Sequence, residues 1–146
     1  MTTVPNAVAK LRKLTTLDLG SNQLTSLPEK IGNLTQLNTI RLGSNRLTSL
    51  PESFGNLRSL SGGLYLAGNR LTSLPSQIGN LQNITAIDLS KNNTQTYYSY
   101  NDSYYYDICP AYGTLKTLPE SIGNLVNLTS LDRKSTRLNS SHLGIS

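Results

Sequence analysis

Leucine returns along this chain at regular intervals, with polar residues at fixed places between. The segment LTTLDLGSNQLTSLPEKIGN, which begins at Leu14, is repeated with few changes from Leu37, Leu60 and Ile84. One asparagine marks each unit, with spacings of 23, 24 and 23 residues between Asn22, Asn45, Asn69 and Asn92. A fixed period of this length is typical of proteins whose units stack on one another. The pattern returns at 115–131.

Each unit changes its hydrophobic period once. In TLDLG, Leu17 and Leu19 face one way and Asp18 the other, which is the alternation of a short strand. In PEKIG, Pro28 favours the start of a short helical or 3-10 segment, and we expect Gly32 to end it. The units therefore predict parallel strands stacked on one side of a coil and short helical segments stacked on the other.

The interior of such a coil is expected to be aliphatic. Its inward positions in one unit are Leu14, Leu17, Leu19, Leu24, Leu27, Ile31 and Leu34. Truncating one of them to alanine is expected to cost about 2–5 kcal/mol. The asparagine amides can satisfy backbone groups where each strand turns away, so we predict a structural role for them. The third unit has one extra residue, where Gly62 and Gly63 allow a bulge.

The L-x-x-L-x-L-x-x-N-x-L pattern resembles the leucine-rich-repeat family. The LPxxIGNL segment resembles its 23-residue subclass, found in intracellular Ras-scaffold, plant Ras-group-related and Roco-type proteins. The resemblance covers about Val4 to Asn92 and Leu115 to Leu131. It implies an α/β repeat domain at 1–131, a right-handed solenoid with one parallel strand per repeat on the concave face and helical or 3-10 segments on the convex face. It also implies a protein-binding scaffold in signalling, with a small GTPase or another signalling protein as partner.

The last segment, DRKSTRLNSSHLGIS at 132–146, breaks the repeat. It resembles one reading frame of a common sequencing adapter, so we expect a disordered tail outside the domain. The only histidine, His142, lies there, and so do three of the 13 basic residues. Part of the net charge of +5 therefore comes from this tail.

The residue inventory argues against catalysis. Before residue 132 there is no histidine, one cysteine (Cys109) and seven scattered carboxylates, with no phosphate loop, nucleophile signature or metal-ligand spacing. We predict a protein that is not an enzyme and has no cofactor or metal. No secretory signal or long apolar run is visible, so the expected location is cytoplasmic, with no membrane partner.

The outward column of the strands is the candidate binding surface. It reads Asp18, Arg41, Tyr65, Asp88, with alternating charge and small neutral neighbours, which does not suit a polyanion such as nucleic acid. The cations Lys10, Arg12 and Lys13 are interpreted as a solvated rim. Tyrosine and arginine are enriched at protein interfaces. The predicted protein contacts are therefore Thr16, Asp18, Thr39, Arg41, Tyr65, Asp88 and Lys91.

A second function fits the same pattern. The repeats can serve as a sensor or structural segment of a larger receptor, kinase or GTPase, with no independent activity. The open reading frame around the repeats discriminates between this and an independent scaffold.

A tyrosine-rich segment at 93–113 interrupts the leucine pattern. Relative to the first unit it adds 21 residues between Asn92 and Leu115. It is an excursion that offers a contact loop, or a degenerate coil with Tyr105, Ile108 and Pro110 at strand positions, or a retained untranslated stretch. The predicted loop contacts are Tyr97, Tyr98, Tyr100, Tyr104, Tyr105 and Tyr106.

Overall fold

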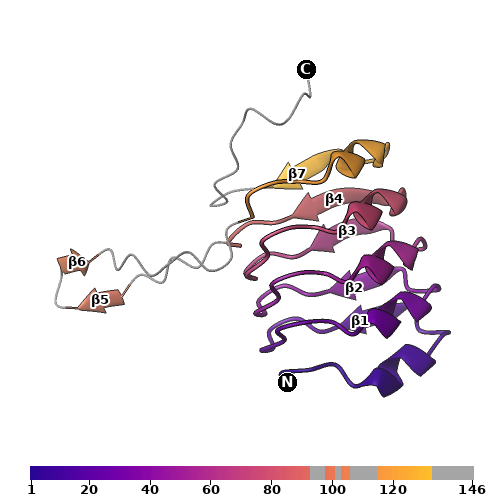
Figure 1. Cartoon of the computed structure of the whole chain (residues 1–146), viewed down its shortest axis with the longest axis horizontal. Helices are drawn as coiled ribbons and strands as arrows, with labels where there is room; N and C mark the ends of the chain where they lie inside the picture. The colour runs from indigo at the N-terminus through magenta and orange to yellow at the C-terminus, as the bar shows by residue number, and fades with distance from the viewer. Residues whose placement is uncertain (93–97, 101–102, 106–114, 133–146) are drawn as a thin grey trace.

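The strands of the repeats form one parallel sheet. The computed structural model describes residues 1–92, 98–100, 103–105 and 115–132. Its five-stranded sheet has the order β1-β2-β3-β4-β7 (Figure 1). These strands are β1 (Thr16–Asp18), β2 (Thr39–Arg41), β3 (Gly62–Tyr65), β4 (Ile84–Asp88) and β7 (Ser130–Asp132).

The opposite side of each coil is a single 3-10 turn. These turns are η1 (Asn6–Lys10), η2 (Glu29–Asn33), η3 (Glu52–Asn56), η4 (Ser76–Asn80) and η5 (Glu120–Asn124). In each turn a proline precedes the first residue with an extended backbone, for example Pro28 at φ −69° and ψ 145°. The predicted leucine-rich-repeat solenoid, with strands on one side and 3-10 turns on the other, is confirmed.

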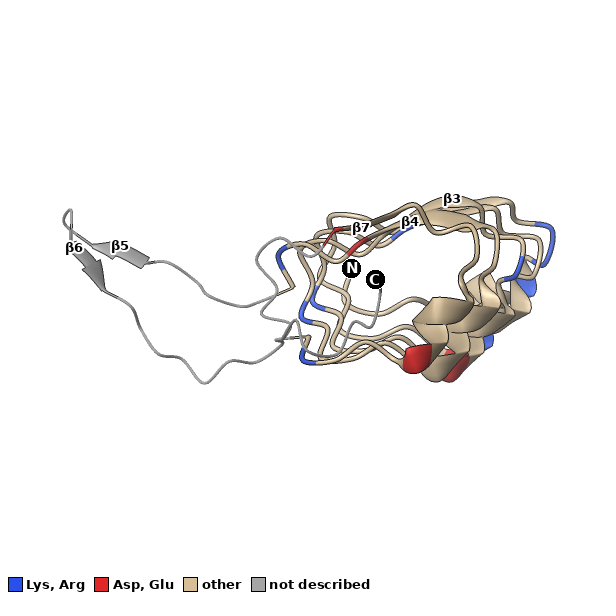
Figure 2. Ribbon diagram, turned by 90° about the horizontal axis from the view of Figure 1, so that it is seen from above, with Lys and Arg blue, Asp and Glu red and all other residues tan. Residues whose placement is uncertain are grey.

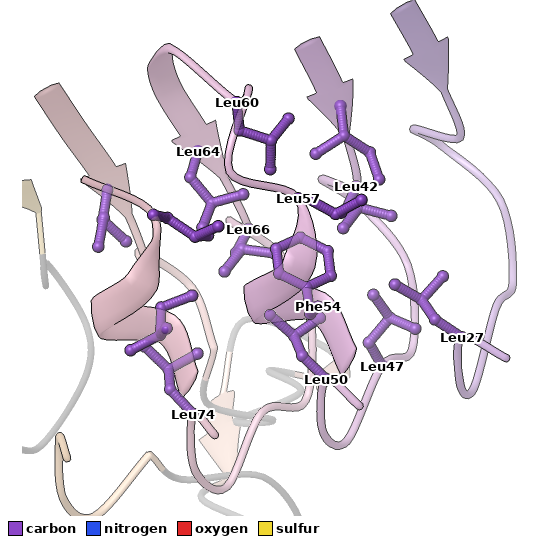
Figure 3. Packing of buried hydrophobic residues seen from close by; sticks show 14 of the residues in the cluster. Leu27, Leu42, Leu47, Leu50, Phe54, Leu57, Leu60, Leu64, Leu66 and Leu74 are labelled. Carbon is purple, nitrogen blue, oxygen red and sulfur yellow. The ribbon is translucent and has the colours of Figure 1, made fainter. Parts of the chain in front are cut away.

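Leucine and isoleucine side chains fill the inside of the coils. Leu24, Ile31 and Leu34 are fully buried, and their equivalents stack above them in the later units. Phe54 takes the place of Ile31 in the second full unit and is also fully buried (Figure 3). The short strands contribute few hydrogen bonds each, so this continuous stack supplies most of the stability.

The asparagine row joins neighbouring coils through hydrogen bonds. The backbone N–H of Leu24 donates to Asn45 Oδ1 (3.0 Å), and Asn45 Nδ2 donates to the carbonyls of Leu19 (2.8 Å) and Leu42 (3.1 Å). The same pattern recurs at Asn69 and Asn92. The predicted structural role of these amides is confirmed.

The glycine of each 3-10 turn has a role that differs from the predicted one. Gly32 does not end its turn, because η2 continues to Asn33 and the φ of Gly32 is not positive. Instead, a Cβ on Gly32 would overlap the backbone carbonyl of Ser53 in the next coil. The same overlap would occur at Gly55 with Gln77 and at Gly79 with Ser121. Glycine is needed here so that the turns of successive coils can approach closely.

The extra residue of the third unit forms the predicted bulge. Gly62 has a φ of +73°, in the left-handed region that side chains disfavour. The pairing of β3 with β4 shifts register between Gly62 and Gly63. The column of outward residues therefore stays aligned beyond the extra residue.

The solenoid continues directly across the tyrosine-rich segment. β4 pairs with β7 in the register Ala86↔Ser130, Ile87↔Leu131 and Asp88↔Asp132. A degenerate coil would place a strand between them, so that interpretation is wrong. β4 already supplies the strand of this coil, and the added residues enter only between Asn92 and Leu115, both fully buried.

Part of the added segment forms a separate hairpin. β5 (Tyr98–Tyr100) and β6 (Ser103–Tyr105) make a two-stranded antiparallel sheet outside the main one. Such a pair fits the predicted excursion. Ile108 and Pro110 lie outside the described residues, as does the expected tail from residue 133 onward. Asp132, which we assigned to that tail, ends β7, and its carbonyl accepts the Leu89 N–H (2.9 Å).

Candidate concave binding face

The parallel strands bring the predicted column together. Cα pairing places Asp18 beside Arg41, Arg41 beside Tyr65, and Tyr65 beside Asp88. Asp18, Arg41 and Tyr65 are exposed and Asp88 is half-buried. These four side chains therefore form one outward row across the sheet, defined here as the concave column.

The concave column is flanked by small residues. Thr16 pairs with Thr39, and Gly63 pairs with Ala86, which pairs with Ser130. Thr16 is exposed and Thr39 half-buried, as predicted for outward positions. These side chains are shorter than those of Arg41 and Tyr65 in the neighbouring column.

Tyr65 is the largest exposed group of the column. Its side chain is 51% exposed. A Cβ built on Gly63 would overlap the Tyr65 ring atoms Cζ, Oη and Cε2. The ring therefore lies over the backbone of Gly63, in a place that exists only because that residue is glycine. From the sequence, Tyr65 was predicted to be a binding contact, whereas Gly63 was assigned only to the bulge.

Asp18 and Arg41 form an ion pair across two coils. Arg41 Nη1 lies 3.7 Å from Asp18 Oδ2, and both side chains are more than half exposed. Solvent screens such a pair, which is worth about 0–1 kcal/mol. The pair therefore contributes little to the stability of the fold.

Both aspartates of the column also bind the backbone of their own coil. The N–H of Gly20 donates to Asp18 Oδ1 (3.0 Å), and the N–H of Ser90 donates to Asp88 Oδ1 (2.9 Å). These bonds satisfy backbone groups where the strand ends. The sequence interpretation of Asp18 and Asp88 as contacts alone missed this structural part.

Lys91 lies apart from the concave column. It is exposed in the turn after β4, with a φ of 54°. Ser21 and Ser44 have the same left-handed backbone at the equivalent position, and Gly68 holds it in the third unit. Lys91 is therefore one residue of a repeated turn and is not brought into the row.

Asp132 extends the column beyond the predicted residues. It pairs with Asp88 and lies half-buried in β7. The match of TSLD at 129–132 to TTLD at 15–18 was the signal that could have found it. The resemblance of 132–146 to an adapter placed the boundary one residue too early for this strand.

The predicted loop contacts do not join the concave column in one sheet. In the β5–β6 hairpin Tyr98 pairs with Tyr105, and Ser99 pairs with Tyr104. Tyr100, also predicted, pairs with Ser103. Tyr97 and Tyr106 lie outside the described residues.

Charged residues of both signs lie around the coil. Seen down the stack, acidic and basic segments lie both on the strand side and around the 3-10 turns (Figure 2). Within the described ranges, no three His, Cys, Asp or Glu residues lie close enough to hold a metal ion. No helix in that part of the chain is long and apolar enough to span a membrane.

Part of the sequence matches a family model. The model described as Leucine rich repeat matches residues 5–61. No curated protein sequence matches the chain.

Solved structures share the fold over almost the whole chain. A leucine-rich-repeat protein of Leptospira interrogans is 30% identical, with a TM-score of 0.75. The match covers 95% of this chain and 30% of the Leptospira chain. The plant peptide hormone receptor RGFR1, solved with RGF2, is 29% identical with a TM-score of 0.68, covering 94% and 19%.

A third structure has a similar relation to this chain. The leucine-rich-repeat ectodomain of the Arabidopsis thaliana receptor kinase GASSHO1/SCHENGEN3, solved with Casparian strip integrity factor 2, is 29% identical with a TM-score of 0.70. It is covered over 14% of its length, against 94% of this chain. The chain thus spans less than a third of each of these structures. Its fold is that of leucine-rich-repeat proteins.

Proposed function

We propose that this chain is a non-enzymatic protein-recognition module that binds an extended segment of a partner along the concave column. The observation that carries the proposal is Tyr65, half exposed at the centre of the sheet with its ring over Gly63. An ordered aromatic ring offers contact area at low entropic cost, and such residues dominate binding energy at interfaces. Two structures of the same fold are receptors solved in complex with RGF2 and Casparian strip integrity factor 2.

Replacing Tyr65 tests the concave column directly. Peptides selected from a random displayed library on the wild-type chain serve as probes, with affinities measured by calorimetry. Tyr65→Ala is expected to weaken binding by more than about 1 kcal/mol, at least fivefold, because the central contact is lost. Asp18→Ala is expected to change affinity little, since Asp18 is directed to Arg41 and the backbone.

The controls separate the ring from its surroundings. Tyr65→Phe keeps the ring over Gly63 and is expected to retain most of the affinity. Glu52→Ala alters an exposed residue of η3 on the opposite side and is expected to be neutral. Equal affinity of all selected peptides for wild type and Tyr65→Ala would remove the concave-column proposal.

A second proposal is that the repeats are the sensor segment of a larger receptor, kinase or GTPase. The observation favouring it is that the chain spans only 30%, 19% and 14% of the three structures described above. Sequencing the transcript around the repeats tests it. A kinase, GTPase or membrane segment in the same frame is the expected result, and a frame with repeats alone contradicts it.

The kind of protein partner that we propose is based on the resemblance of the LPxxIGNL segment to one subclass of the family. Similarity of LPxxIGNL to the Ras-scaffold, plant Ras-group-related and Roco-type subclass supports a small GTPase in the cytoplasm as the signalling partner. Saturable binding of a GTP-analogue-loaded small GTPase, lost in Tyr65→Ala, is the expected result. Binding that is unaffected by Tyr65→Ala argues for another partner.

A further inference from the structure

The junction between η1 and η2 is built differently from those that follow. Ala9 occupies the position that Gly32, Gly55 and Gly79 hold in the later turns, and it is 4% exposed. A methyl group at those glycines would overlap the backbone of the next coil. Ala9 carries such a methyl group, and it is buried at the junction with η2.

A hollow of about 530 Å³ lies at this junction. Ala7 and Ala9 form its apolar part. Its polar lining consists of Lys10, Arg12, Lys30, Asn6 and Asn33. A shallow, open part of the neighbouring surface shares Lys10 and Arg12 and adds Lys13. Alanine side chains and three basic residues thus line this corner, whose surface is more apolar than polar.

The charge of this hollow is of one sign. None of Lys10, Arg12 and Lys30 forms an ion pair with a carboxylate in the part of the chain that the structure describes. Glu29, the neighbour of Lys30 in η2, does not line the hollow. The next junction has no such set, because Lys10 is replaced by Asn33 and Lys30 by Ser53 in the following unit.

We propose that the hollow between η1 and η2 binds a small molecule or headgroup that carries at least two phosphate groups. Arginine presents a planar set of donors that matches phosphate oxygens, and lysines add point charges. The Asn6 and Asn33 amides can donate beside them. Three cations exceed what a single phosphate dianion neutralises, so two phosphate groups fit the charge better than one. This site is separate from the concave column.

Inorganic pyrophosphate is the probe, and its binding to the intact chain is measured by calorimetry at about 0.15 M ionic strength. Wild type is expected to bind one pyrophosphate and to bind inorganic phosphate at least tenfold more weakly. Lys10→Asn and Lys30→Ser introduce the residues of the next unit at the same positions. Each is expected to weaken pyrophosphate binding at least fivefold while circular dichroism stays unchanged.

Two controls separate a built site from general charge. Arg46→Gln and Arg70→Gln remove cations outside the hollow, at the position that Gln23 holds in the first unit, and are expected to leave binding unchanged. Ala9→Gly keeps every charge and removes only a methyl group that lines the hollow, and is expected to weaken binding if the shape of the hollow matters. No saturable pyrophosphate binding by wild type, or equal losses in Arg46→Gln and Lys30→Ser, overturns the proposal.

Vesicles identify the source of the phosphates. Binding to vesicles that carry a bisphosphorylated headgroup, displaced by pyrophosphate and lost in Lys30→Ser, assigns a lipid headgroup. Pyrophosphate binding with no vesicle binding assigns a soluble ligand. Vesicle binding that Lys30→Ser and pyrophosphate leave unchanged contradicts a site in this hollow.

Discussion

Each buried asparagine of the repeat holds two coils together. Asn69 Oδ1 accepts the N–H of Leu47 (3.0 Å), and Asn69 Nδ2 donates to the carbonyls of Leu42 (2.9 Å) and Leu66 (3.0 Å). These backbone groups are buried, so the Asn69 amide is the partner that satisfies them away from solvent. Asn22 differs, because it is half-buried, its amide donates only within its own coil, and its Oδ1 accepts from the exposed amino terminus of Met1 (3.2 Å).

Asn69→Ala is expected to destabilise the chain by about 3 kcal/mol, because it leaves one buried donor and two acceptors without their partner. Asn22→Ala is the matched control and is expected to cost less than about 1 kcal/mol. Urea unfolding followed by circular dichroism measures both. Equal urea midpoints for the two variants would contradict the conclusion that hydrogen bonds of Asn69 between coils stabilise the fold.

Gly55→Ala is expected to destabilise the chain by about 1–3 kcal/mol, because the added methyl group meets the Gln77 carbonyl of the next coil. Gly123 holds the same place in η5 with nothing within 4 Å of an added Cβ. Gly123→Ala is therefore expected to be neutral or to stabilise by up to about 1 kcal/mol. Thermal unfolding compares the pair, and a similar loss in both would point to backbone conformation as the reason for glycine.

The sequence located these residues but explained only some of them. The period and the polarity of asparagine in an apolar unit were enough to predict the structural amides. The prediction that Gly32 ends its turn was wrong. It was based on the residues that commonly follow helices, whereas glycine is needed here because the backbone of Ser53, in the next unit, lies too close for a side chain. Contacts between units depend on how the coils stack, and one unit's sequence does not show that distance.

At the scale of elements, the tyrosine-rich addition leaves the solenoid unbroken. η4 is followed in the stack by η5, and β4 by β7, although 93–114 separate the two halves of this coil in sequence. The addition of 21 residues is close to one repeat, which made a degenerate coil plausible from spacing alone. Strand pairing resolves the question, because a strand has only two neighbours and β4 already has β3 and β7.

Deleting 93–113 restores the spacing of the other units, since Thr114 then separates Asn92 from Leu115 as Gln23 separates Asn22 from Leu24. The deletion is expected to keep the fold and to raise stability by up to about 2 kcal/mol, because a long loop no longer has to be closed.

The matched control for this deletion removes 93–114, one residue more, and joins Asn92 directly to Leu115. It is expected to lower the urea midpoint, because either the Asn92 bonds or the burial of Leu115 must be lost. Unfolding of the 93–113 deletion itself would show that the addition supports the coil.

Across the whole molecule, two surfaces of different chemistry lie on opposite sides of the same stack. The concave column presents Tyr65 between an ion pair and a half-buried aspartate. The hollow between η1 and η2 presents cations on the side of the 3-10 turns. Because each unit contacts mainly its neighbours, a change in one surface is expected to leave the other largely unaffected.

How far each surface could be predicted follows from this geometry. Outward positions of a strand alternate with inward ones, so Asp18, Arg41 and Tyr65 were found from the sequence alone. The position of the Tyr65 ring over Gly63 depends on the change of strand register at the bulge, which the sequence does not show. The basic hollow brings Lys10 and Arg12 of one unit beside Lys30 of the next, and an alignment of repeats does not show that these residues share one surface.

The coil that contains β4 stays intact although a segment is inserted between Asn92 and Leu115. This position is therefore suitable for inserting foreign segments. Asn92 and Leu115 keep their buried positions on either side of the added segment. The coil therefore restricts where the two ends of an inserted segment lie, but it does not restrict the length of that segment. A reporter domain or a binding loop whose ends lie close together can be spliced there without disturbing the stack. The corresponding joins at Asn22–Leu24, Asn45–Leu47 and Asn69–Leu71 differ, because the single residue within each of them donates its backbone N–H to the preceding coil.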